Sequence, residues 1–85
     1  MKLFIAITLM PIILFASIKN VKIKMSEAIL IAQSKSAGRL AESSLELENK
    51  FFIYNITFLE PDRKILEIKI DANTGNILDI ATKNE

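Results

Sequence analysis

The chain contains no cysteine and no histidine. Without cysteine, no disulfide can strengthen the fold, although small exported domains often depend on such bonds. Zinc sites are built mainly from cysteine and histidine, and a serine nucleophile needs a neighbouring base such as histidine. We therefore expect no zinc site, no Ser–His catalysis, no cofactor and no lipid anchor of the cysteine-linked type. Stability has to come from the hydrophobic core alone.

An excess of charge of either sign is also lacking. The 85 residues include 11 Lys and Arg against 10 Asp and Glu. Proteins that bind nucleic acid need a surplus of basic side chains to neutralise phosphates, so we expect no nucleic-acid partner. Of all these charges, only Lys2 lies within the first 18 residues.

The N-terminal segment has the composition of an export signal. Met1 and Lys2 precede an apolar run at 3–16 that is interrupted only by Thr8 and Pro11. As a helix this run would be about 21 Å long, which is short for a membrane-spanning anchor and typical of a signal peptide. We interpret 1–17 as a cleaved signal peptide, with an uncleaved anchor or a buried core helix as alternatives. We expect a periplasmic or extracellular protein that touches a membrane only through this segment, if the segment is retained.

The remaining residues suffice for one small domain. We divide them into an extended lead-in at 18–24, a folded domain at 25–82 and a polar tail at 83–85. A domain of this size buries only about 60% of the surface of its unfolded chain, so its stability is marginal.

The first element of this domain is predicted to be a helix at 26–37. Ser26 is a suitable N-cap, because its hydroxyl can accept a hydrogen bond from a free N–H of the first turn. Glu27 then suits the positive end of the helix dipole. Gly38 is the predicted stop, since glycine adopts the left-handed conformation at little cost.

Four segments with alternating apolar and polar residues follow, joined by short turns. The predicted strands are 40–48, 51–59, 64–70 and 77–81. Their inward-facing residues are expected to be Leu45, Leu47, Phe52, Tyr54, Ile56, Phe58, Leu66, Ile68, Ile70, Leu78 and Ile80. Short turns require antiparallel neighbours, and the apolar sheet face needs the helix as cover. The sequence thus predicts an α+β fold with one N-terminal helix packed on a four-stranded antiparallel meander.

Two groups of oxygen-bearing side chains lack the pattern required for a metal site or a catalytic site. Asp71, Asn73 and Asn76 share a loop, but glycine falls at the wrong position for a calcium loop and no glutamate follows at the required spacing. The three carboxylates Glu46, Glu48 and Glu67 would lie on a sheet face of a domain too small to form a catalytic cleft. We expect turn formation from the first group and a solvated surface from the second, with no metal and no catalytic residues.

Several motifs together resemble the PepSY domain family. They are the Ser-Glu-Ala helix start at 26–28, Gly38, Tyr54 in a middle strand, and a closing hairpin made by Asp71, Ala72, Thr74 and Gly75. The resemblance extends over about 25–81. It implies a non-enzymatic exported module that binds or inhibits a peptidase of the cell envelope. The alternative is a structural or sensory envelope protein that uses the domain for self-association or for docking to a membrane complex.

One feature departs from the family pattern. Phe51 and Ile53 lie on the sheet face that should be polar, and neighbouring exposed apolar side chains can mark an interaction surface. We predict a protein-contact face at this pair, with cover by the lead-in or by a second copy in a homo-oligomer as the alternatives.

Overall fold

The computed structural model describes residues 21–84, in which one helix is followed by four strands. The helix α2 (Met25–Gln33) precedes the strands β1 (Arg39–Glu48), β2 (Phe51–Glu60), β3 (Lys64–Asp71) and β4 (Ile77–Asn84), with a 3₁₀ turn η1 (Pro61–Arg63) between β2 and β3. The predicted α+β class is confirmed. The predicted signal segment 1–17, residues 18–20 of the lead-in and Glu85 lie outside the described residues.

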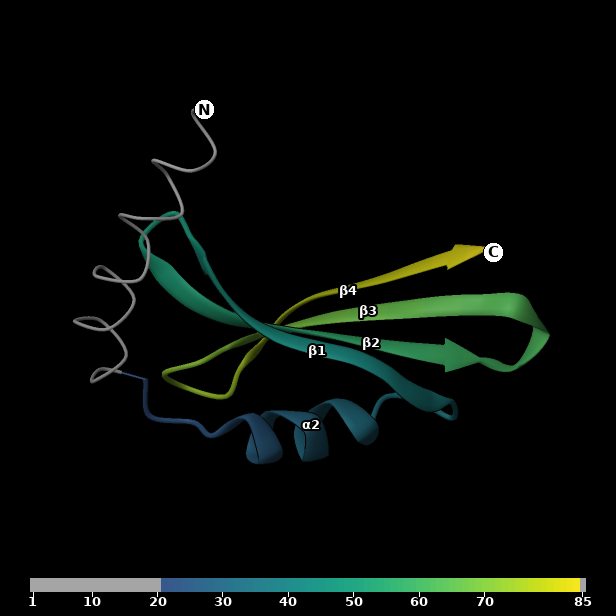
Figure 1. Cartoon of the computed structure of the whole chain (residues 1–85), viewed down its shortest axis with the longest axis horizontal. Helices are drawn as coiled ribbons and strands as arrows, with labels where there is room; N and C mark the ends of the chain where they lie inside the picture. Colours follow the sequence, from purple (N-terminus) through teal and green to yellow (C-terminus); the bar gives the residue numbers. More distant parts are fainter. Residues whose placement is uncertain (1–20, 85) are drawn as a thin grey trace, which may run out of the picture.

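The strands form one antiparallel meander in the order β1-β2-β3-β4. The main contacts of α2 are with β1, β2 and β3. In Figure 1, β4 runs along the upper edge of the sheet toward the right, and α2 lies below the sheet. The molecule therefore has two layers, and the helix covers the sheet unevenly.

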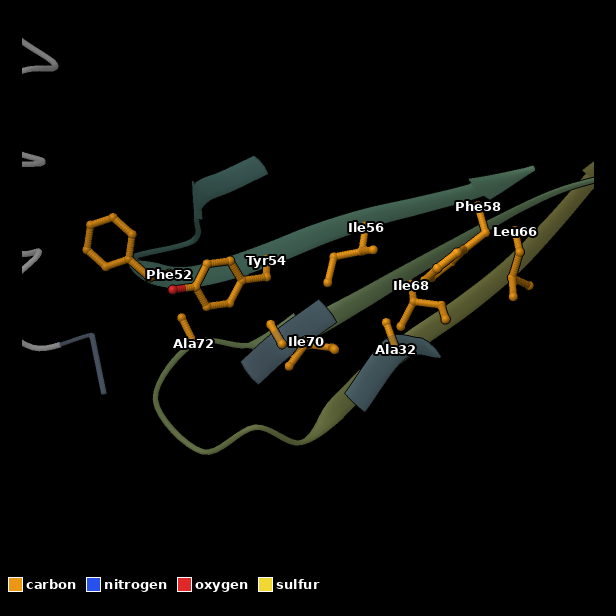
Figure 2. Packing of buried hydrophobic residues seen from close by; sticks show 10 residues of the cluster. Ala32, Phe52, Tyr54, Ile56, Phe58, Leu66, Ile68, Ile70 and Ala72 are labelled. Carbon is orange, nitrogen blue, oxygen red and sulfur yellow. The ribbon is translucent and has the colours of Figure 1, made fainter. Parts of the chain in front are cut away.

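The hydrophobic core lies between α2 and the face of the sheet that α2 covers. Figure 2 shows Phe52, Tyr54, Ile56 and Phe58 of β2 pointing into the same layer as Ala32 and Ala72. The helix contacts the sheet through Ala28 and Ala32, which are both fully buried. Their small side chains let the backbone of α2 approach the sheet. The core cluster consists of Ala28, Ala32, Phe52, Tyr54, Ile56, Phe58, Leu66, Ile68, Ile70 and Ala72. The alternation predicted for β2 and β3 is confirmed.

The ends of the helix differ from the prediction. The N-cap is Lys24, so Ser26 lies inside the first turn. The backbone N–H of Lys24 donates a hydrogen bond to Glu27 Oε1 (3.3 Å), and the carboxylate thus supplies a cap from the helix side. At the other end α2 stops at Gln33, and Ser34 donates its hydroxyl hydrogen bond to the carbonyl of Ile31 (2.7 Å).

Gly38 does not end the helix. A Cβ at this position would overlap the backbone carbonyl oxygen of Leu59 in β2. The N–H of Gly38 donates to Ser36 Oγ (2.9 Å) and to Glu60 Oε2 (3.0 Å), and the Ser36 hydroxyl also donates to the Glu60 carboxylate. Glycine is needed here because the backbone passes close to the end of β2.

The turns predicted between the first three strands are confirmed. Asn49 and Lys50 join β1 to β2 with φ values of 48° and 71°, as expected for a two-residue hairpin whose twist matches the strands. Asp62 and Arg63 also have positive φ, 65° and 60°. These reversals keep consecutive strands adjacent.

The last strand is longer and less regular than predicted. β4 continues to Asn84, three residues beyond the predicted end. Lys69 pairs with Asp79, whereas Ile70 pairs with Ile77, so Leu78 is the extra residue of a β-bulge. As a result Ile77 packs against the core, while Leu78 is 51% exposed and Ile80 is 46% exposed. The predicted inward direction is confirmed for Ile80, which lies opposite the buried Ile68, but neither Ile80 nor the bulge residue Leu78 is covered.

Candidate functional site

The hairpin motif between β3 and β4 has a structural role. Asp71 Oδ1 accepts hydrogen bonds from the N–H groups of Asn73 (2.7 Å) and Thr74 (3.3 Å). The hydroxyl oxygen of Thr74 accepts one from the N–H of Asn76 (3.2 Å). Gly75 has φ 82°, a conformation that glycine adopts without steric cost. The side chains of Asp71 and Thr74 thus bond to their own turn.

Ala72 connects this hairpin to the rest of the molecule. It is fully buried, and its N–H donates to the carbonyl of Phe52 in β2 (3.0 Å). Its carbonyl accepts hydrogen bonds from the N–H groups of Lys22 (3.2 Å) and Ile23 (2.9 Å) in the lead-in. These hydrogen bonds join the hairpin, β2 and the lead-in at one buried residue.

Tyr54 also bonds to the lead-in, through the carbonyl of Ile23. Its ring is 4% exposed, and its hydroxyl donates a hydrogen bond to the carbonyl of Ile23 (2.5 Å). Figure 2 shows this ring beside Phe52 and above Ala72. Burial, and secondarily the negative charge of Glu27, raises the pKa of Tyr54 above its ordinary value. The residue therefore acts as a core hydrogen-bond donor.

The predicted contact pair, Phe51 and Ile53, divides into two different environments. Phe51 is 61% exposed, whereas Ile53 is 8% exposed. Ile53 lies opposite Glu46 in β1 and Asp71 in β3. The lead-in residues Val21 and Ile23 pack against the core cluster, which does not include Ile53. Phe51 is thus the accessible member of the pair.

The rest of this outer face, which we define as the sheet face opposite α2, carries polar residues that bond to one another. Glu46 Oε2 accepts hydrogen bonds from Ser44 Oγ (2.9 Å) and Asn55 Nδ2 (3.5 Å). Lys69 bonds to Glu48 (3.2 Å), and Lys83 bonds to Glu67 (3.3 Å). The three glutamates Glu46, Glu48 and Glu67 therefore lie on one face, and each bonds to a side chain of another strand. For Glu48 that partner is Lys69 of β3, on the far side of β2.

Two further observations bear on what residues 21–84 can do. They contain no pocket and no group of three or more acidic side chains placed to share a metal ion. None of the helices in this part of the chain is both long and apolar enough to cross a membrane. A small-molecule site is thus not evident in the described part, and the available surfaces are open ones.

The open surface that sequence analysis missed is the edge formed by β4. Ile80 lies opposite Ile68, which is fully buried. Residues opposite each other in a ladder share a face, so Ile80 faces the helix side but lies beyond the main contacts of α2. The apolar alternation of the strand was visible in the sequence, but the position of the helix was not.

Comparison with protein-family models gives one match, to "PepSY: Peptidase propeptide and YPEB domain", over residues 22–81. No curated protein and no solved structure gives a significant match. Domains of this kind are associated with peptidase propeptides, are generally non-catalytic and occur typically in exported proteins. The match covers most of the chain and includes α2, Tyr54 and the Asp71–Gly75 hairpin. The chain therefore belongs to the PepSY family.

Proposed function

We propose that this protein is an exported, non-enzymatic module that binds a peptidase of the cell envelope and restrains its activity. The observation that carries this proposal is the family match over residues 22–81, because the family is associated with peptidase propeptides. Open surfaces without a pocket in the described residues suit protein binding better than catalysis on a small substrate.

The contact that we propose is Phe51, at the end of the outer face. It is 61% exposed, and large aromatic side chains contribute more than most residues to protein interfaces. It follows the tight turn at Asn49 and Lys50, so a partner can approach it without meeting α2. The buried Ile53 supports the strand beneath this contact.

A peptidase assay tests the proposal directly. Purified chain is added to several envelope peptidases, and hydrolysis of a peptide substrate is followed. We expect one of them to be slowed by the wild-type chain and to regain activity with Phe51→Asp. Unchanged activity of every peptidase in the panel would argue against the proposal.

Leu30→Asp serves as a matched control. Leu30 is a similarly exposed apolar residue (67%) but lies on α2, so this variant should still restrain the peptidase. Both variants change an exposed side chain, and their thermal unfolding should remain close to that of the wild type. If both variants lose the ability to slow the peptidase to the same extent, the contact is not specific to Phe51.

The alternative function is a structural or sensory envelope protein that associates with itself or with a membrane complex. The exposure of Leu78 and Ile80 along β4 favours this second candidate. The two functions are compatible, since Phe51 and β4 are different surfaces.

A further inference from the structure

We propose that two copies of this chain associate through β4, antiparallel and about a two-fold axis at Ala81, to form a continuous eight-stranded sheet. This inference goes beyond peptidase binding and does not depend on it. It rests on the geometry, the exposure and the charge pattern of one strand.

The edge of β4 is suited to pairing over a limited length. β4 is the last strand of the sheet, and an edge strand presents unpaired N–H and C=O groups. The bulge at Leu78 interrupts the ladder, but the pairing with β3 is regular from Asp79 to Asn84. The regular stretch available to a partner is therefore centred near Ala81.

The charges on this stretch are self-complementary. Asp79 and Lys83 lie two residues on either side of Ala81 and share the outer face. In an antiparallel pair centred on Ala81, Asp79 of each copy lies opposite Lys83 of the other. Opposite charges that face each other across strands stabilise the pair, whereas like charges destabilise it.

The existing contacts of the outer face extend this pattern. Lys69 of β3 lies opposite Asp79, and Glu67 bonds to Lys83 (3.3 Å). Pairing would place Asp79 of one copy beside Lys83 of the other. The charges would then alternate in sign across the junction, from Lys69 and Asp79 of one copy to Lys83 and Glu67 of the other. At the axis itself, the small side chain of Ala81 leaves the strands free to approach.

The same pairing would also cover exposed apolar surface on the face of the sheet that α2 packs against. Ile80, 46% exposed in the single chain, would have Thr82 of the second copy on its open side. Isologous interfaces of this type repeat each contact twice.

The other edge of the sheet lacks this complementarity. β1 carries Glu42, Glu46 and Glu48 on the outer face and has its own irregularity between Leu40 and Glu42. Antiparallel self-pairing centred on Ser44, for example, would place Glu42 opposite Glu46. The charge pattern therefore selects β4 over β1.

A charge-reversal experiment tests the register as well as the association. The chain, in the form isolated from expressing cells, is examined by sedimentation equilibrium. Asp79→Lys places a lysine at 79 opposite Lys83 of the second copy, and Lys83→Asp places two aspartates opposite each other. Each variant alone should dimerise about tenfold or more weakly than the wild type.

Mixing the two variants distinguishes the proposed interface from a folding defect. In the mixed pair, both cross-strand contacts become opposite in sign again, so an equimolar mixture should recover dimers. Glu42→Lys on the β1 edge is the control and should dimerise like the wild type. Circular dichroism should give the same spectrum for all variants.

Two results would overturn the proposal. One is a wild-type chain that remains monomeric at about 0.1 mM, which would leave β4 free for a strand of another protein. The other is a dimer that neither variant weakens, or that the mixture fails to restore, because the contact would then lie elsewhere. Inhibition of a peptidase is a separate measurement, so failure here leaves the proposed peptidase function standing.

Discussion

At the scale of single residues, Tyr54 shows how one polar atom organises the fold. Its hydroxyl reaches the carbonyl of Ile23 (2.5 Å), a group that belongs to the lead-in rather than to the sheet. A buried carbonyl without a donor costs free energy, so this bond and the two bonds to Ala72 fix the lead-in on the sheet. The aromatic residue is therefore needed for the position of a neighbouring segment as much as for the core.

Tyr54→Phe should lower the free energy of unfolding by about 1 kcal/mol, since it removes one hydrogen bond and keeps the ring. Urea unfolding followed by circular dichroism measures this loss. Phe52→Leu, which changes the core without touching a hydrogen bond, helps to separate packing from hydrogen bonding. An unchanged midpoint for Tyr54→Phe would mean that the bond to Ile23 contributes nothing.

The raised pKa of Tyr54 predicts a dependence of stability on alkaline pH. The folded state favours the neutral phenol, so the contribution is complete below the ordinary pKa of 10.0 and is lost as pH rises through the higher value of the folded protein. Tyr54 is the chain's single tyrosine and there is no tryptophan, so tyrosinate absorbance reports on this group alone. Its titration midpoint should be higher in folded than in urea-unfolded protein, and Tyr54→Phe should show a smaller loss of stability over the same range.

The two glycines should respond differently to substitution by asparagine. Gly75 has φ 82°, and a Cβ there would meet Ile31 Cδ1 at an ordinary 3.4 Å, so the backbone conformation decides the outcome. Gly75→Val should cost about 1–2 kcal/mol or more, and Gly75→Asn much less, because asparagine tolerates the left-handed region. At Gly38 both alanine and asparagine should destabilise, since any Cβ meets the carbonyl of Leu59. Thermal unfolding of the four variants would contradict this account if asparagine rescued both sites.

At the scale of elements, the central strands followed from the sequence and the peripheral ones did not. β2 and β3 alternate because both of their neighbours are strands and one face is covered by α2, so parity decides which face each residue occupies. Ile53 is an exception in burial, because it lies on the outer face and is only 8% exposed. β4 has a neighbour on one side, and its bulge at Leu78 depends on how it leaves the Asp71–Gly75 hairpin. No local pattern of residues encodes that shift.

The helix ends illustrate a second limit of sequence-based prediction. Ser26 and Gly38 are the residue types preferred at helix caps, yet the helix begins at Met25 and ends at Gln33. The carboxylate of Glu27 caps the N-terminus, and Gly38 is fixed by its approach to β2. Both outcomes depend on contacts between residues far apart in the sequence. The different burial of Phe51 and Ile53 is a similar case, because their alternation in the sequence is the same.

Removing the residues after Ala81 tests the extra length of β4. In the structure Thr82 lies opposite Leu66, and Asn84 lies opposite Lys64. Truncation should therefore cost about 1–3 kcal/mol through lost ladder hydrogen bonds and exposure of Leu66. Hydrogen exchange should show faster amide exchange at the start of β3 than in the intact chain. Equal protection in both forms would mean that these residues do not stabilise the sheet.

At the scale of the whole molecule, the predicted signal segment 1–17 precedes the residues that match the PepSY family model. The family match begins at Lys22, and the first residues that contact the core in the described structure are Val21 and Ile23. The hydrogen bonds at Ala72 fix the lead-in at this point. A signal peptidase acting before residue 18 would thus leave every described contact in place.

We therefore expect the protein isolated from its native envelope to begin at Ser17 or Ile18, and its stability to equal that of a chain produced without residues 1–16. Intact-mass spectrometry of the isolated protein gives the first result, and paired urea titrations give the second. The reason for the second expectation is that burial, hydrogen bonding and strand pairing within 21–84 account for one continuous core. A chain recovered from the cytosol with Met1 in place, and less stable when the apolar segment is removed, would instead make that segment part of the core and would contradict the proposed export.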